Sequence, residues 1–473
     1  MTALTSPRFK ENARAALADT QLQRAIRDAG GGFVERRQEA AGRLAEFDQL
    51  RDAARAIKDH TLSHLDLYLE TYEQRVTAQG GQVHYAINAE EARATILGIC
   101  RKANARIATK GKSMVSEEIG LNAFLEANGI TPVETDLGEY IIQIRGEAPS
   151  HIIAPAIHVT KEQVQADFRR VHTHLPADRN LEESTTMLAE ARGVLREKFL
   201  AADVGITGAN FLVAESGTSI IVTNEGNGDL TQTLPPVHIV LATIEKLVPT
   251  LEDAAQLFRV LARSATGQDM SVYTTLSTGP RRPGDPDGPR EYHVIVLDNG
   301  RSAMLGSAFQ DMLRCIRCGA CMNHCPVYNA VGGHAYGFVY PGPMGSVLTP
   351  AIVGIENAKH LPNASTLCGR CEEVCPVRIP LPRMLRAWRE REFERHLSPA
   401  TVRSGLALWA YFAKRPRLYG FAAGIATWML SGLGRRKGRF RWLPFASGWT
   451  RHRDFPAPQG ATFQALWKAR SES

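Results

Sequence analysis

Cysteine is nearly absent from most of this chain. Seven of its eight cysteines lie between residues 315 and 375. No run of eighteen apolar residues occurs, and the nearest candidate, residues 418–433, is short and rich in glycine, so a membrane-spanning helix is not expected. The first residues contain no apolar core of a secretory signal. We therefore expect a cytoplasmic protein, in which clustered thiols stay reduced and serve as metal ligands rather than as disulfides.

Acidic residues are scarce near the C-terminal end of the chain. Between residues 401 and 470 a single acid, Asp454, stands against thirteen lysines and arginines, although the net charge of the whole chain is only +7. Aromatic residues such as Trp409, Trp428 and Trp442 lie among these cations. A basic, aromatic segment can bind nucleic acid, anionic lipid or an acidic protein. Because no nucleic-acid-binding motif accompanies it, we expect docking on a partner subunit or peripheral contact with a membrane surface.

Motifs that bind nucleotide cofactors are also lacking. No G-x-G-x-x-G follows a predicted strand, so neither FAD nor NAD is expected on this chain. Residues 110–113 lack the spacing of a phosphate-binding loop. The glycines of residues 224–228 follow a strand, and they can form a tight turn or bring backbone amides close to a ligand. A two-electron acceptor is therefore expected on another subunit.

Four regions follow from the sequence pattern. Residues 1–75 are predicted to form a helical arm, a hairpin interrupted at residues 30–32. Residues 76–300 alternate strands and helices, which predicts an α/β domain with a mostly parallel sheet. Residues 301–395 are predicted to form an α-helical ferredoxin-like domain. Its first helix is expected over residues 302–316 and leads into the first cysteine run. Residues 396–473 form the basic extension.

Within the α/β region, apolar runs bounded by turn residues predict the strands. They lie at residues 131–134, 140–145, 151–153, 219–223, 237–241, 272–276 and 293–297. An acidic group lies near the first of them, without a histidine at metal-ligand spacing. We expect these acids to lie on the surface or to cap helices; they are Glu117, Glu118, Glu134, Asp136 and Glu139.

The cysteines form two related runs. The first, Cys315, Cys318, Cys321 and Cys325 followed by Pro326, reads C-x2-C-x2-C-x3-C-P, the run that bacterial ferredoxins use for four-iron clusters. Zinc sites commonly use two separate pairs of ligands instead. The second run reads C-x2-C-x3-C-P and consists of Cys368, Cys371 and Cys375 before Pro376. Two [4Fe-4S] clusters are therefore predicted.

The spacing also predicts which cysteines share a cluster, because the last cysteine of such a run binds the other cluster. Cluster 1 takes the first three cysteines of the first run and Cys375, and cluster 2 takes Cys368, Cys371 and Cys325. Ser365 stands where a complete second run would have a fourth cysteine. Its oxygen, an external ligand or a three-iron cluster are the alternatives for that corner. Cys100 lies apart from both runs and is expected to be a small buried residue.

Several stretches outside the cysteine runs point to a family. They are residues 112–122, 134–140, 149–153, 205–210, 223–228 and 279–288. Together with the order of the regions they resemble the lactate utilization protein B family over nearly the whole chain. The resemblance implies an α/β domain similar to the ribose-phosphate isomerase and CoA-transferase superfamily. It further implies two companion subunits, a CCG-type cysteine-rich protein and a second α/β protein, in the oxidation of L-lactate to pyruvate.

Electron transfer within a lactate-oxidising complex is thus the leading hypothesis, and three others stand beside it. The chain can serve another 2-hydroxy acid, such as glycolate, and pass electrons to quinone. It can be a metal-dependent nucleic-acid-binding regulator, as the basic extension would allow. Finally, its α/β domain can itself be catalytic, with Glu117 and Glu134 as the only candidates.

Overall fold

The computed structural model describes residues 4–111, 113–443, 446–450 and 453–471. Lys112, in one of the stretches that carry the family resemblance, lies outside the described residues. The chain forms two compact units, residues 1–392 and residues 393–473. The first unit contains both the α/β region and the cysteine loops.

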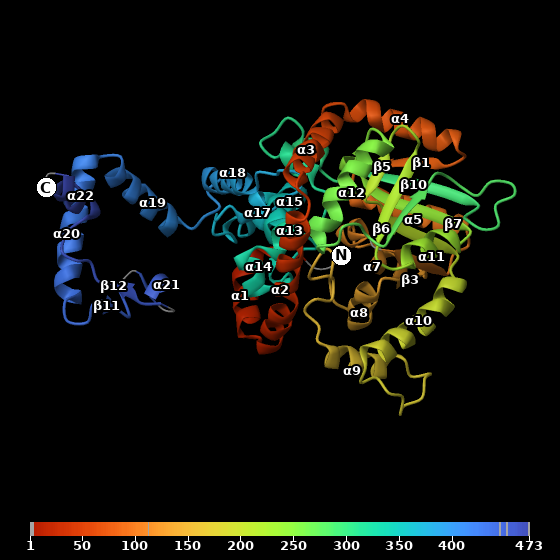
Figure 1. The fold of residues 1–473 in the computed structure, drawn as a ribbon, viewed down its shortest axis with the longest axis horizontal. Helices are drawn as coiled ribbons and strands as arrows, with labels where there is room; N and C mark the ends of the chain where they lie inside the picture. Colours follow the sequence, from red (N-terminus) through yellow and green to blue (C-terminus); the bar gives the residue numbers. More distant parts are fainter. Residues whose placement is uncertain (1–3, 112, 444–445, 451–452, 472–473) are drawn as a thin grey trace. The chain divides into compact units, whose positions relative to one another are not determined.

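A six-stranded parallel sheet is the centre of the first unit (Figure 1). Its strands, in spatial order, are β1 (Gln82–Ala86), β10 (Glu291–Leu297), β7 (Val237–Thr243), β4 (Val204–Gly208), β2 (Ile107–Gly111) and β3 (Thr131–Glu134). The predicted mostly parallel sheet is confirmed. All seven residues of β7 are buried, as expected for a central strand that is covered on both faces.

Alternate residues of the central strands enter two different cores. Ile239 and Leu241 of β7 pack with α5 (Ala89–Lys102), α6 (Met114–Glu118) and α7 (Leu121–Glu126) on one face. Val240 and Ala242 pack with α4 (Leu65–Ala78) on the other. This two-residue alternation follows from the pleat of a strand. Cys100 is fully buried in the first core, as predicted.

Further elements extend this sheet region. A second sheet has the order β8 (Leu247–Val248), β5 (Phe211–Val213), β6 (Thr218–Thr223) and β9 (Tyr273–Ser277). The longer helices here are α9 (Lys161–Val171), α10 (Ser184–Leu200) and α12 (Leu251–Ala265). The short helix α11 (Asn227–Thr233) follows the turn at residues 224–226. This turn therefore leads directly into a helix.

Two predicted strands are wrong. Residues 140–145 belong to helix α8 (Leu137–Arg145). Asp136 caps its N-terminus, because its carboxylate accepts hydrogen bonds from the amides of Gly138 and Glu139. The first amides of a helix have no partner within the helix, and the carboxylate of Asp136 satisfies two of them. Residues 151–153 form a bend, because the ring of His151 accepts from the amides of Ile153 and Ala154. Strands β1 and β2 were not predicted.

The N-terminal arm consists of α1 (Phe9–Ala18), α2 (Thr20–Gly42), α3 (Phe47–Ser63) and α4. The predicted interruption at residues 30–32 is wrong, because α2 continues through it. Glycine lowers helix propensity by only about 1 kcal/mol per residue, which tertiary packing of a long helix can outweigh. The side chain of Arg37 on α2 donates to the carbonyl of Val374, so this helix is anchored on the second cysteine run.

Short helices surround the cysteine runs. The predicted helix over residues 302–316 is replaced by two 3-10 turns, Ser302–Met304 and Gln310–Arg314. Between the runs lie α14 (Pro326–Val331), α15 (Gly342–Val353) and α16 (Ile355–Ala358), and α18 (Leu381–Glu394) follows them. Trp388 of α18 stacks on Phe309 with ring centroids 4.1 Å apart and donates to the carbonyl of Val347.

The second unit contains α19 (Ala400–Ala413), α20 (Pro416–Gly434), α21 (Ser447–Thr450), α22 (Phe463–Ser471) and the antiparallel strands β11 (Arg439–Phe440) and β12 (Phe455–Pro456). Many of its aromatic side chains are exposed, among them Trp409, Trp428 and Trp467. Within the described ranges, none of the helices has the length and hydrophobicity that crossing a bilayer requires.

Candidate metal centre

The two cysteine loops have the same backbone design, at an offset of fifty residues. The residue before Cys318 and the residue before Cys368 both have positive φ, +59° at Arg317 and +55° at Leu367. A glycine with positive φ then starts a four-residue helix, α13 (Ala320–Asn323) in the first loop and α17 (Arg370–Glu373) in the second. Glycine adopts this backbone without strain.

This correspondence places Ser365 at the position that Cys315 holds in the first loop. The amide of Arg317 donates to the sulfur of Cys315 at 3.4 Å. In the second loop, the amide of Leu367 donates to the Oγ of Ser365 at 3.1 Å. The two side chains therefore have equivalent local hydrogen bonding, although one is a thiol and the other a hydroxyl.

The first three cysteines of the first run share their surroundings with Cys375. Burial, together with the charges of Cys375 and Cys315, raises the pKa of the Cys318 thiol to about 12. Burial raises the pKa of Cys375 to about 11, although the amide of Ile379 donates to its sulfur at 3.3 Å and lowers it. A metal bound here would displace the protons of these thiols, because the thiolate is the form that binds metal.

The other three cysteines also influence one another. Burial raises the pKa of Cys371 to about 12, with further contributions from Cys325 and Cys368. Burial likewise raises the pKa of Cys325, and Cys368 adds to this. Cys368 itself is exposed, and the amide of Arg370 lowers its pKa. The second loop is thus more open to solvent than the first.

Cations of the N-terminal arm hold the second cysteine run in place. Arg51 of α3 donates to the carbonyls of Cys375 and Glu373, and Arg37 donates to that of Val374. Lys58 of α3 is buried and donates to the carbonyls of Glu245 and Leu247. The sequence pattern suggested only a packing arm here. Because these cations interact through backbone carbonyls, no sequence motif marks them.

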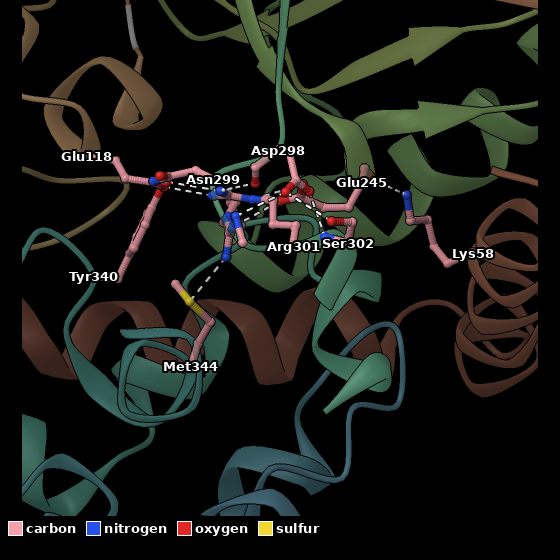
Figure 2. A network of polar contacts seen from close by, with 11 residues as sticks. Lys58, Glu118, Glu245, Asp298, Asn299, Arg301, Ser302, Tyr340 and Met344 are labelled. Carbon is pink, nitrogen blue, oxygen red and sulfur yellow. Dashed lines mark hydrogen bonds and ion pairs between the residues drawn. The ribbon is translucent and has the colours of Figure 1, made fainter. Parts of the chain in front are cut away.

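A buried ion-pair network joins the α/β region to the cysteine loops (Figure 2). Arg301 is fully buried and forms two hydrogen bonds with the carboxylate of Glu118, at 2.9 and 2.6 Å. Tyr340 donates to the same carboxylate at 2.6 Å. Glu245 binds both Arg301 and Arg317, at 3.1 and 3.0 Å. Since Arg317 belongs to the first cysteine loop, the network fixes this loop against the sheet.

The expectation of a surface role for the acidic residues is wrong for most of them. Glu118, Glu134 and Glu139 are buried. Glu134 binds the buried ammonium group of Lys110 at 2.5 Å, and Glu117 binds it at 3.3 Å. Burying a carboxylate requires such a partner. Only Asp136 follows the capping expectation, as described for α8.

The donor set fits iron–sulfur clusters. Across residues 4–111, 113–443, 446–450 and 453–471, no three histidine, cysteine or acidic side chains are close enough to share one metal ion. A four-iron cluster does not need such convergence, because each thiolate binds a different iron atom. Seven thiols on two loops of matching conformation therefore form a donor set that fits iron–sulfur clusters.

Comparison with known families agrees with this site. Residues 311–379 match the 4Fe-4S dicluster domain, residues 69–297 match the LUD domain, and residues 370–472 match the C-terminal region of lactate utilisation protein B. The fold and the cysteine loops thus define an iron–sulfur electron-transport protein with an α/β domain.

Curated relatives cover nearly the full length. The chain is 42% identical to Lactate utilization protein B of Bacillus licheniformis over 98% of this chain and 97% of the relative. It is 40% identical to the protein of that name in Bacillus subtilis, over 98% and 97%. An Escherichia coli K12 relative, 41% identical over 97% and 96%, is described as the uncharacterized electron transport protein YkgF. This chain belongs to the lactate utilization protein B family, and it is an iron–sulfur protein of lactate utilization.

A solved structure of a DUF162 family protein from Deinococcus radiodurans matches 49% of this chain and 98% of its own length, with 16% identity and a TM-score of 0.28.

Proposed function

We propose that this protein is the electron-transfer subunit of a multi-protein system that oxidises L-lactate to pyruvate and so permits growth on lactate. The observation that carries the proposal is the pair of matching cysteine loops, fixed against an α/β domain, in a chain whose relatives are named for lactate utilization. Oxidation of lactate to pyruvate releases two electrons and two protons. Clusters, when bound, supply one-electron steps that carry those electrons onward.

We further propose the ligands of the two clusters. Cys315, Cys318, Cys321 and Cys375 hold cluster 1, and Cys325, Cys368 and Cys371 hold three corners of cluster 2. Cys375 and Cys315 act on the pKa of Cys318, whereas Cys325 and Cys368 act on that of Cys371, and these effects support the grouping. The Oγ of Ser365 takes the place of the Cys315 sulfur and accepts from the amide two residues further on, as that sulfur does. We therefore propose Ser365 as the fourth ligand of cluster 2.

The Ser365→Cys variant should raise the reduction potential of cluster 2, because thiolate is a softer donor than an alkoxide oxygen. Ser365→Ala should also shift this potential and lower the iron content toward a three-iron cluster. Both potentials can be measured by redox titration with EPR detection of the reduced clusters. Unchanged spectra in Ser365→Ala would show that Ser365 does not hold this corner.

The companion proteins and the basic extension complete the proposal. The two partners are a CCG-type cysteine-rich protein and a second α/β protein, in the cytoplasm. Exposed tryptophans beside arginines make the second unit a docking surface for a partner subunit, with peripheral membrane contact as the alternative. We also propose that the α/β domain shares its superfamily with ribose-phosphate isomerase and the CoA-transferases.

Deleting the gene for this chain should abolish growth on L-lactate and leave growth on glycolate unchanged. Complementation with the wild-type chain should restore growth, whereas a chain with Cys318→Ala should not, because cluster 1 would lose one of its four thiolates. Growth curves on each acid as sole carbon source provide the measurement. Loss of growth on glycolate alone would instead favour the glycolate-type hypothesis.

A further inference from the structure

A cavity of about 120 Å³ opens at the carboxyl end of the central sheet. Its walls include Ser113, which follows β2, Asn210, which follows β4, and Lys246, which follows β7. From β2 the chain continues to β3 at one edge of the sheet, whereas from β4 it continues to β7 in the opposite direction. The direction in which successive strands are added therefore reverses between β2 and β4. In open parallel sheets, ligands bind at such a reversal, outside the carboxyl ends of the strands.

The first cysteine loop closes the other side of this cavity. Arg317, Cys318 and Tyr340 belong to its lining. Through Arg317 and Tyr340, this wall is part of the buried network that fixes the loop against the sheet. A molecule in the cavity would therefore lie between the α/β region and a thiol that we assign to cluster 1.

A buried lysine, Lys246, lines the cavity. Lys246 is only 6% exposed, and among the described residues its ammonium group has no hydrogen-bond or salt-bridge partner. Burial and the charge of Arg317 together lower the pKa of Lys246 to about 8. Glu245 acts in the opposite direction, but its carboxylate is already bound to Arg301 and Arg317. Because a buried charge is costly unless paired, this arrangement favours an anionic ligand.

The size of the cavity limits the ligand. Drug-sized ligands and cofactors occupy about 300–1,000 Å³, so a volume near 120 Å³ has no room for a nucleotide or a CoA ester. Val222 and Leu261 add apolar surface to the lining. The combination suits a short acid with one carboxylate and a small apolar group.

We propose that this cavity binds a small 2-hydroxy or 2-oxo carboxylate, whose carboxylate group pairs with Lys246 beside the first cysteine loop. The proposal rests on the proposed function, since it deepens that function by placing the acid on this chain. Arg317 contributes positive potential, and Asn210 offers polar atoms for the second oxygen function. The site concerns binding alone and assigns no chemical step to these residues.

Calorimetric titration of the anaerobic, iron-loaded full-length protein with L-lactate and with pyruvate tests this site. Lys246→Met should weaken binding of both acids at least about tenfold, because a charge-assisted bond is lost. Ala209→Leu, which fills the cavity and keeps every charge, should also prevent binding. Lys102→Met is the matched control, because this lysine is 71% exposed and is not part of the cavity lining. This variant should bind both acids with the affinity of the wild type.

EPR spectroscopy provides a second measurement of binding, independent of the calorimetry. Pyruvate should change the EPR signal of reduced cluster 1 in the wild type and in Lys102→Met, but not in Ala209→Leu. The iron content of each variant shows whether its clusters are assembled. If Lys246→Met loses iron, the comparison of Ala209→Leu with the wild type tests the site instead. The site is disproved if neither acid binds the wild type, or if both variants bind as tightly as it does.

The growth experiment separates this result from the proposed function. A chain that is required for growth on lactate but binds neither acid would overturn the cavity proposal alone. A deletion strain that still grows on lactate would overturn the proposed function, whatever the calorimetry shows.

Discussion

Cys368→Ala should remove cluster 2 and leave about four irons per chain, and adding Cys325→Ala to it should cause no further loss. Under the crossed assignment both cysteines bind cluster 2, which Ser365 and Cys371 cannot hold alone. Cluster 1 keeps all four of its thiolates in the double variant. Iron and sulfide analysis of anaerobically purified protein, with EPR of the reduced state, provides the measurement.

The matched control combines Cys368→Ala with Cys375→Ala. Under the crossed assignment this double variant removes one cysteine ligand from each cluster. The cluster that remains, cluster 1, should have only three thiolates and an altered EPR signal. If each run instead held its own cluster, the two outcomes would be exchanged. An intact four-thiolate signal in the Cys368→Ala, Cys375→Ala protein would therefore refute the assignment.

Arg301→Met is expected to lower the free energy of unfolding by about 3–5 kcal/mol, the cost of leaving a buried charge without its partner. Arg301 is fully buried and binds Glu118 through two nitrogens and Glu245 through a third. Burial raises the pKa of Glu118, but Arg301 and Tyr340 more than offset this, so that its net pKa is lowered. Urea titration followed by circular dichroism measures the change.

Arg386→Met is the control for this experiment. Arg386 pairs with Glu390 at 3.0 Å, but the two side chains are 74% and 59% exposed. Exposed pairs contribute about 0–1 kcal/mol, so this variant should unfold within about 1 kcal/mol of the wild type. Equal stability of the Arg301 and Arg386 variants would mean that the buried network does not support the fold.

The cysteine loops could be predicted from the sequence because their ligands are local. Spacings of two and three residues decide which thiols one loop can present, and the structure shows matching loops at those positions. The parallel sheet was predictable for a similar reason, since strands such as β7 and β10 are short apolar runs between turn residues. These features depend on neighbouring residues.

What the sequence did not show depends on contacts between distant residues. Arg301 and Glu118 are 183 positions apart, and Arg51 reaches the carbonyl of Cys375 across 324 positions. The helix at residues 137–145 resembles a strand because Tyr140, Ile141 and Ile142 form a short run of large, mainly apolar side chains. Its caps, Asp136 before it and Gly146 after it, are what distinguish it. Lys246 likewise has no motif, and its role emerges only from the cavity around it.

Metal analysis of the anaerobically purified, full-length protein decides whether this chain holds two iron–sulfur clusters. We expect about seven to eight irons per chain, with matching inorganic sulfide, and an EPR signal from [4Fe-4S] clusters after reduction. Zinc in place of iron, or protein that is fully folded with neither iron nor sulfide, would contradict it.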